Sequence, residues 1–143
     1  WCGTIAHNGT CGVGCEEDWA SHFLEHEVSA IYNVTHGAGL SVIVPAWMTF
    51  MAGHNPKKIA RFANRVFGVP ESEDLEEMAL AGVSRLKHFF RFIGLPVNFK
   101  ELGIEEPDID RLADSLHRNK GEFVGNYVKL TKQDSKEIYR LAL

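Results

Sequence analysis

The stretch DWASHFLEHEVSAIYNVTHGAGLSVIVPAWM, residues 18–48, predicts helices on either side of a short break. Asp18 is a suitable N-cap, because its side-chain oxygen can accept a hydrogen bond from a free backbone N–H group in the first turn. The helix that it starts is expected to end near Tyr32, and residues 33–35 form the break. His36 then begins an uncharged run that contains Pro45 and that we interpret as a buried helix pair.

Helical patterns also dominate the remaining sequence. Residues 55–68 have apolar side chains at the 3, 4, 7, 8 spacing of one helix face, with Asn55 as a candidate N-cap and Gly68 just past the end. Residues 73–93 repeat this pattern after Ser72, a candidate cap. Shorter helices are expected at residues 98–102, 107–118 and 133–142, and a loop with some extended character at residues 119–132.

These patterns predict an all-α fold in one domain. The sequence contains no alternating strand series, no repeat and no low-complexity tract. A chain of 143 residues is long enough to bury a core of its own. The pattern does not determine how the helices pack.

Charge and hydropathy argue against two classes of partner. The net charge of −4 and the pI near 6.0 do not fit a nucleic-acid-binding protein, which usually presents a basic face. The uncharged run from Gly37 to Gly53 is shorter than the roughly 20 apolar residues that cross a membrane. Three cysteines are an odd number, and reduced thiols in a cytoplasmic protein explain them most simply.

The candidate functional residues are three of the seven histidines, which fall within fifteen residues. His22 and His26 are four apart, so both lie on one helix face. His36 follows the break and can meet them if the two helices pack against each other. Imidazole nitrogens bind zinc and ferrous iron, so this group indicates a metal site.

Two alternatives stay open on residue patterns alone. His22-Phe23-Leu24-Glu25-His26 matches the H-x-x-E-H signature, in which both histidines bind zinc and Glu25 would be the base of a hydrolase. That signature fixes only three residues and occurs often by chance. The other alternative is a non-enzymatic helical interaction domain whose histidines are incidental.

The wider stretch resembles the iron-dependent alcohol dehydrogenases. Within that family it is similar to the NAD(P)H-dependent butanol dehydrogenase and aldehyde reductase branch. The resemblance rests on Asp18-Trp19-Ala20-x-His22, Glu25-His26-Glu27, Ser29-Ala30, His36-Gly37-x-Gly39-Leu40 and Pro45-Ala46, and extends weakly to the C-terminus through Gly125-Asn126-Tyr127 and Leu130-Thr131.

The resemblance implies a specific assignment of the three histidines. It maps two metal ligands onto His22 and His36, which are fourteen residues apart. It places His26 beside the nicotinamide and the substrate, as a catalytic and cofactor-binding residue outside the metal's ligands. The metal would be Fe²⁺ or Zn²⁺.

The resemblance also implies what completes the enzyme. The family joins an N-terminal α/β domain, which binds NADH or NADPH and supplies an Asp and a His ligand, to a C-terminal helical domain of dehydroquinate synthase-like architecture. This chain begins at Trp1 and has no strand-rich half. Residues 1–143 are therefore expected to be the C-terminal domain alone, inactive by itself. Its expected partners are a small alcohol or aldehyde and its own N-terminal domain, and a homodimer is compatible with the apolar surface exposed without that domain.

Overall fold

The computed structural model describes residues 1–143 and consists of helices without a β-sheet, which confirms the all-α prediction. The extended character expected between residues 119 and 132 is present as one isolated bridge between Val124 and Leu130. The elements are α1 (Cys2–His7), the 3₁₀ turn η1 (Thr10–Gly12), α2 (Ala20–Tyr32), α3 (His36–His54), α4 (Lys57–Phe67), α5 (Leu75–Phe92), α6 (Ile109–Lys120) and α7 (Lys132–Arg140).

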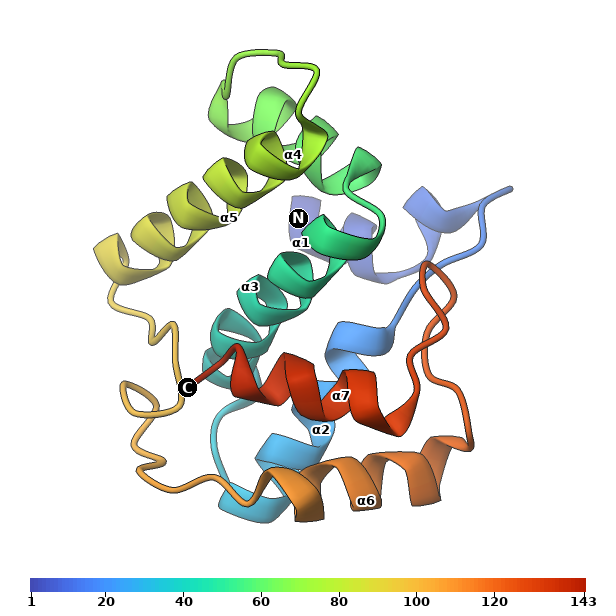
Figure 1. The fold of residues 1–143 in the computed structure, drawn as a ribbon, viewed down its shortest axis with the longest axis vertical. Helices are drawn as coiled ribbons and strands as arrows, with labels where there is room; N and C mark the ends of the chain where they lie inside the picture. Colours follow the sequence, from blue (N-terminus) through green and yellow to red (C-terminus); the bar gives the residue numbers. More distant parts are fainter.

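Helix α3 forms the centre of the molecule and contacts α2, α4, α5 and α7 (Figure 1). It continues through Pro45, so the predicted helix pair at residues 37–53 is wrong. An interior proline removes a backbone hydrogen bond and destabilises a helix by about 3 kcal/mol. Here the helix is surrounded by protein, with Val42, Ile43 and Ala46 fully buried, and this burial offsets the cost.

Helices α4 and α5 pack against each other through apolar faces that follow the predicted periodicity, although Val66 on the α4 face is 61% exposed. Gly68 ends α4 in the left-handed conformation, with a φ of 63°, as expected. The caps at the helix starts were predicted wrongly. Pro56 precedes α4 without a side-chain cap, and Asp74 caps α5 in place of Ser72 because its carboxylate reaches the Glu77 N–H at 2.9 Å.

Helices α6 and α7 pack together on the other side of α3 (Figure 1). Both predicted helices are present, and Thr131 and Asp134 form a capping box at the start of α7. The predicted helix at residues 98–102 is wrong. Asn98 accepts a hydrogen bond from the Glu101 N–H at 2.7 Å, and Gly103, with a φ of 87°, turns the chain before a second helical turn can form.

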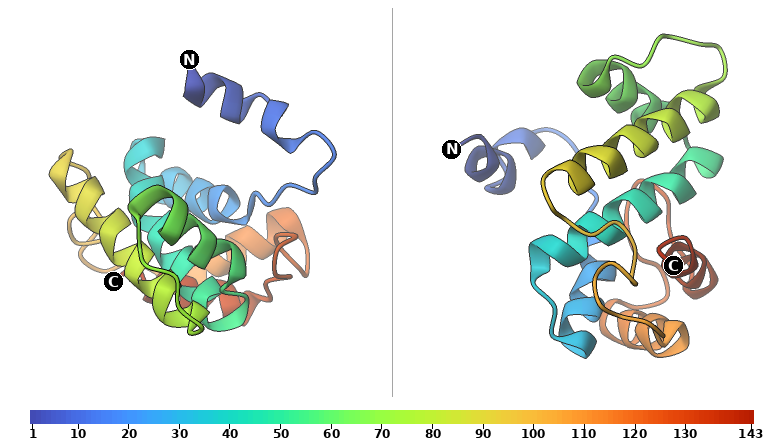
Figure 2. Two further views of the ribbon diagram at one scale, coloured as in Figure 1. Left: turned by 90° about the horizontal axis from the view of Figure 1, so that it is seen from above. Right: turned by 90° about the vertical axis from the view of Figure 1, so that its left-hand side faces the viewer.

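The N-terminal segment stands apart from the other helices, as the left view of Figure 2 shows for α1. No residue of α1 or η1 is buried, and neither element was predicted. All three cysteines lie in this segment, where they are free and exposed. No helix of the structure combines the length and the hydropathy that crossing a membrane requires.

Candidate metal site where α2 meets α3

Three imidazole rings converge where the first half of α2 meets the start of α3. The ring centroids of His22 and His36 lie 5.7 Å apart, those of His26 and His36 5.3 Å, and those of His22 and His26 6.4 Å. His22 and His26 are one turn apart on α2, and His36 is the first residue of α3. The structure therefore brings together all three histidines that the sequence singled out.

The break between α2 and α3 produces this convergence. Asn33 ends α2 in the left-handed conformation, with a φ of 53°, which asparagine tolerates better than most residues. The chain then runs in extended form through Thr35. This break places the ring of His36 next to that of His26, which lies ten positions earlier in the sequence.

Glu25 lies beneath the three rings and is completely buried, with 0% of its surface exposed. One of its carboxylate oxygens, Oε2, contacts Nδ1 of His36, and the other, Oε1, accepts a hydrogen bond from Ser29 Oγ. A buried carboxylate without partners would be strongly unfavourable, so these contacts account for its position. They also hold the His36 ring in one orientation.

His22 is partly covered, and its surroundings favour the neutral imidazole. Burial lowers the pKa of His22, and the neighbouring imidazoles of His36 and His26 lower it further. The indole of Trp19 packs edge-on against the ring, with centroids 4.9 Å apart. A neutral imidazole keeps a lone pair for a metal ion, so these surroundings suit a ligand.

His26 is exposed, as His36 is, but unlike His36 it has no hydrogen-bond partner within the chain. Geometry alone allows it to join a metal site, since ligand atoms of Glu25, His26 and His36 all lie within 4.8 Å of one another. The assignment of His22 and His36 as the metal-binding pair, with His26 beside the substrate, therefore stays a prediction.

The position of Glu25 argues against the hydrolase alternative. In the H-x-x-E-H arrangement the glutamate acts as a base and must face a metal-bound water. Here both carboxylate oxygens are already occupied by Ser29 and His36, and the side chain is sealed from solvent. The contact with His36, a residue outside that signature, is the one that the sequence did not predict.

Two further features of the site were missed. Gly39 lies against Glu25, because a Cβ at position 39 would be 2.1 Å from Glu25 Oε1. His7, which is not among the three candidate histidines, has its ring centroid 5.7 Å from that of Trp19 and so lies near His22. Gly39 belongs to one of the motifs that carry the family resemblance, but nothing in that motif indicated a contact with Glu25.

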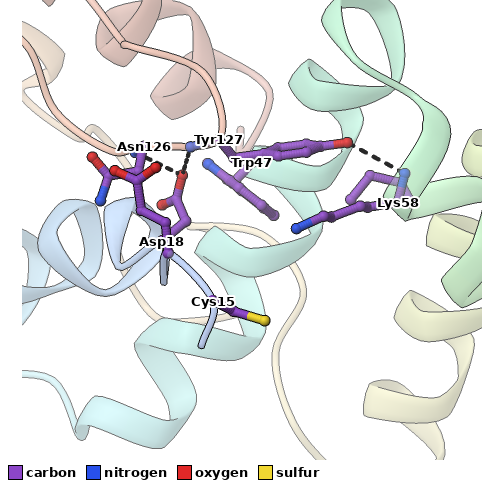
Figure 3. A pocket seen from close by; sticks show the side chains of 8 residues that line it. Cys15, Asp18, Trp47, Lys58, Asn126 and Tyr127 are labelled. Atoms are coloured by element: carbon purple, nitrogen blue, oxygen red, sulfur yellow. Dashed lines mark hydrogen bonds between the residues drawn. The ribbon is translucent and has the colours of Figure 1, made fainter. Parts of the chain in front are cut away.

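A separate pocket of about 470 Å³ lies beside the start of α2 (Figure 3). Asp18, the predicted cap, accepts from Ala20 N–H at 2.6 Å and from the backbone of Asn126 and Tyr127 at 3.0 and 2.6 Å. It thereby ties the loop before α7 to the start of the helix that carries His22. Trp47 and Lys58 complete the wall, and the buried indole N–H of Trp47 has no acceptor.

Comparison with known proteins places the chain in a family. Residues 2–143 match the model of the C-terminal part of the Fe-containing alcohol dehydrogenase family. The probable NADH-dependent butanol dehydrogenase 1 of Bacillus subtilis is 37% identical over 142 residues, which is 99% of this chain and 36% of that protein.

Solved structures agree with the family match. The NADH-dependent butanol dehydrogenase A of Thermotoga maritima superposes with a TM-score of 0.89 at 39% identity, over 99% of this chain and 37% of that one. YqhD of Escherichia coli K-12, an NADPH-dependent aldehyde reductase, gives a TM-score of 0.91 at 29% identity, over 100% and 36%. The chain thus spans little more than a third of these relatives, and it belongs to the Fe-containing alcohol dehydrogenase family, whose C-terminal helical region it carries.

Proposed function

We propose that this chain is the helical, metal-binding half of an NAD(P)H-linked alcohol dehydrogenase that interconverts a small alcohol and its aldehyde. The family and the relatives named as butanol dehydrogenases and aldehyde reductase support this reaction class. The observation that carries the proposal is the convergence of three imidazoles at one end of α2.

His22 and His36 are the proposed metal ligands within this chain. The neutral state favoured at His22 and the fixed ring of His36 each leave a nitrogen lone pair available. An aspartate and a histidine from an N-terminal α/β domain would complete the set. Three nitrogens and one carboxylate suit Fe²⁺ and Zn²⁺ alike, so either metal is compatible with the proposal.

The chemistry follows from these positions. A divalent metal held there would polarise the carbonyl oxygen of an aldehyde, and the nicotinamide would supply the hydride. His26, exposed beside His36, is placed to contact the substrate and either orient it or move a proton. Trp19 and Glu25 keep the adjoining rings in place.

The proposal includes the domain organisation. Residues 1–143 would form one helical domain that needs the α/β domain for cofactor binding and for two of the four metal ligands. The polypeptide alone, assayed with NADPH and butanal in the presence of Fe²⁺ or Zn²⁺, should therefore show no metal-dependent turnover. A cytoplasmic location, expected from the sequence, and a homodimer, which the sequence left open, belong to the same proposal.

Metal titration of the purified chain tests the site. Isothermal titration with Zn²⁺, and anaerobically with Fe²⁺, would compare the parent chain with His22→Ala, His26→Ala and His36→Ala. His88→Ala, at an exposed histidine on α5, is the matched control. We expect binding to be lost in the His22 and His36 variants and retained in the His26 and His88 variants. Binding that needs His22 and His26 but ignores His36 would contradict the proposal and favour the hydrolase alternative.

A further inference from the structure

We propose that Glu25 is the positioning residue of the metal site: its carboxylate holds His36 as the Nδ1–H tautomer and so presents Nε2 as the metal-binding atom. This inference rests on the proposed function, because it assigns a role to a residue behind one of the proposed ligands. It concerns a side chain that cannot itself reach solvent, since Glu25 is 0% exposed.

The two oxygens of Glu25 have different partners. Oε2 meets Nδ1 of His36, and Oε1 accepts from the Ser29 hydroxyl one turn further along α2. Ser29 Oγ also lies 3.2 Å from the carbonyl oxygen of Val34, in the break between the helices. The carboxylate is therefore held from one side by its own helix, through a hydroxyl that lies next to the segment carrying His36.

The start of α3 is shaped to admit this carboxylate. Gly39 lies one turn after His36 and faces Glu25, where a Cβ would come within 2.1 Å of Oε1 and 2.9 Å of Cγ. The space that a side chain would fill is occupied by the carboxylate. The contact with His36 therefore depends on three positions, Glu25, Ser29 and Gly39, and does not arise from a chance rotamer at the surface.

This arrangement determines which ring nitrogen is free. An ionised carboxylate has no hydrogen to donate, so the imidazole nitrogen that contacts it must carry the proton. Nδ1 of His36 faces Glu25, which leaves Nε2 with its lone pair directed away from the carboxylate. Carboxylates that hold metal-binding histidines in this way typically contribute a factor of about 10 to 100 in metal affinity.

Glu27 provides a matched control on the same helix. It is also buried, at 6% exposed, but its carboxylate accepts from the Asn119 side chain at 2.9 Å and touches no histidine. Glu25→Gln and Glu27→Gln therefore make the same chemical change in two buried sites, of which only one adjoins the proposed ligands.

The first readout needs no metal. Nitrogen-15 NMR of the metal-free chain, at about pH 8 where an ordinary imidazole is neutral, reports the tautomer of each histidine. We expect His36 to be predominantly the Nδ1–H form in the parent chain and in Glu27→Gln, and to shift toward the Nε2–H form in Glu25→Gln. An Nε2–H form in the parent chain, or an unchanged ratio in Glu25→Gln, would overturn the inference.

The second readout is Zn²⁺ affinity. Glu25→Gln should bind about 10- to 100-fold more weakly than the parent chain, and Glu27→Gln within about threefold. Ser29→Ala, which keeps the carboxylate but removes one of its hydrogen bonds, should lose about fivefold and serves if Glu25→Gln does not fold. Unchanged affinity in Glu25→Gln, with loss in His36→Ala, would overturn the positioning role and leave the proposed function standing. Unchanged affinity in His36→Ala would overturn both.

Discussion

The α4–α5 pair and the junction of α2 with α3 are both helix contacts, but different forces hold them. Between α4 and α5 the contact is apolar and tight, with Gly82 directly against Ala63. At the junction of α2 with α3 a buried carboxylate, Glu25, occupies the space beside Gly39. Each contact depends on a glycine, but the first uses it to bring two backbones together and the second to admit a charged group.

This difference separates a contact that mainly stabilises the fold from one that belongs to the candidate site. An apolar helix contact contributes to stability in proportion to its buried area and does not require particular side-chain partners. A buried carboxylate contributes less and demands specific partners. Its presence where the first half of α2 meets the start of α3, beside three histidines, is therefore better explained by the site than by the fold.

The largest effect is expected where the backbones are closest. In Gly82→Ala the new Cβ would lie 2.4 Å from Ala63 Cβ and 2.9 Å from its Cα, so the helices must separate. We expect a loss of about 1–3 kcal/mol in the free energy of unfolding by urea titration. Gly53→Ala, at an exposed helical position with no atom nearer than 4.0 Å, should gain about 0.5–1 kcal/mol. Equal effects of the two substitutions would contradict the proposed close contact.

The same comparison at the α2–α3 junction should separate stability from metal binding. Gly39→Ala places a Cβ against the Glu25 carboxylate and should displace it from His36. We expect a loss of at least about tenfold in Zn²⁺ affinity by calorimetry, the factor assigned to such a carboxylate. Gly37→Ala, two residues earlier and with nothing within 4 Å, is the control and should bind as the parent does.

A neutral buried hydroxyl should show a smaller and pH-dependent effect. Tyr139 Oη donates to the Leu24 carbonyl at 2.9 Å, and Tyr139→Phe should lose about 1 kcal/mol of unfolding free energy. Burial raises the pKa of Tyr139, helped by the nearby Glu27 and Glu25 carboxylates. A raised folded-state pKa gives stability that is present below the unfolded value of about 10 and is lost as the pH rises above it.

The alkaline loss from this residue should accordingly be missing in Tyr139→Phe. Urea titrations of the parent chain and of Tyr139→Phe between about pH 8 and 11 would measure this loss. It is the difference between the two slopes of unfolding free energy against pH. Parallel slopes would show that Tyr139 ionises as readily in the folded chain as in the unfolded one.

The smallest effect belongs to the exposed ion pairs between α6 and α7. Lys136 and Lys132 lower the pKa values of Asp110 and Asp114 by hydrogen bonding. Stability from these pairs is present above about pH 3.9 and is lost as the pH falls through the lowered folded-state values. Lys132→Met with Lys136→Met should leave the urea midpoint at pH 7 nearly unchanged and reduce the acid dependence. A large loss at pH 7 would show that surface charge contributes more than expected.

Sequence reasoning predicted the fold where one periodicity dominates. The helices at residues 55–68 and 73–93 followed from apolar spacing, with Gly68 marking the end of the first, and both are present. It failed at Pro45, where burial on every side keeps α3 continuous despite the proline. It failed again at residues 98–102, where the Asn98 side chain accepts a hydrogen bond from the Glu101 N–H and closes a turn that resembles a helix in composition.

For the candidate site, the sequence identified the ring-bearing residues but not their support. The sequence indicated that His36 could meet His22 and His26 if their two helices packed against each other, and the three rings do come together. The role of Glu25 was not predictable, because its partner is eleven residues away across a break whose path depends on Asn33. Helical periodicity describes one helix at a time and gives no information on such contacts.

The most direct test is to locate the metal. Crystals of the chain soaked with Zn²⁺ and measured at the zinc absorption edge would give an anomalous peak at the bound ion. We predict a peak in contact with His22 and with Nε2 of His36, with Glu25 behind His36 and His26 out of contact. A peak held by His22 and His26 and approached by Glu25, or no peak near the three rings, would contradict the proposed site.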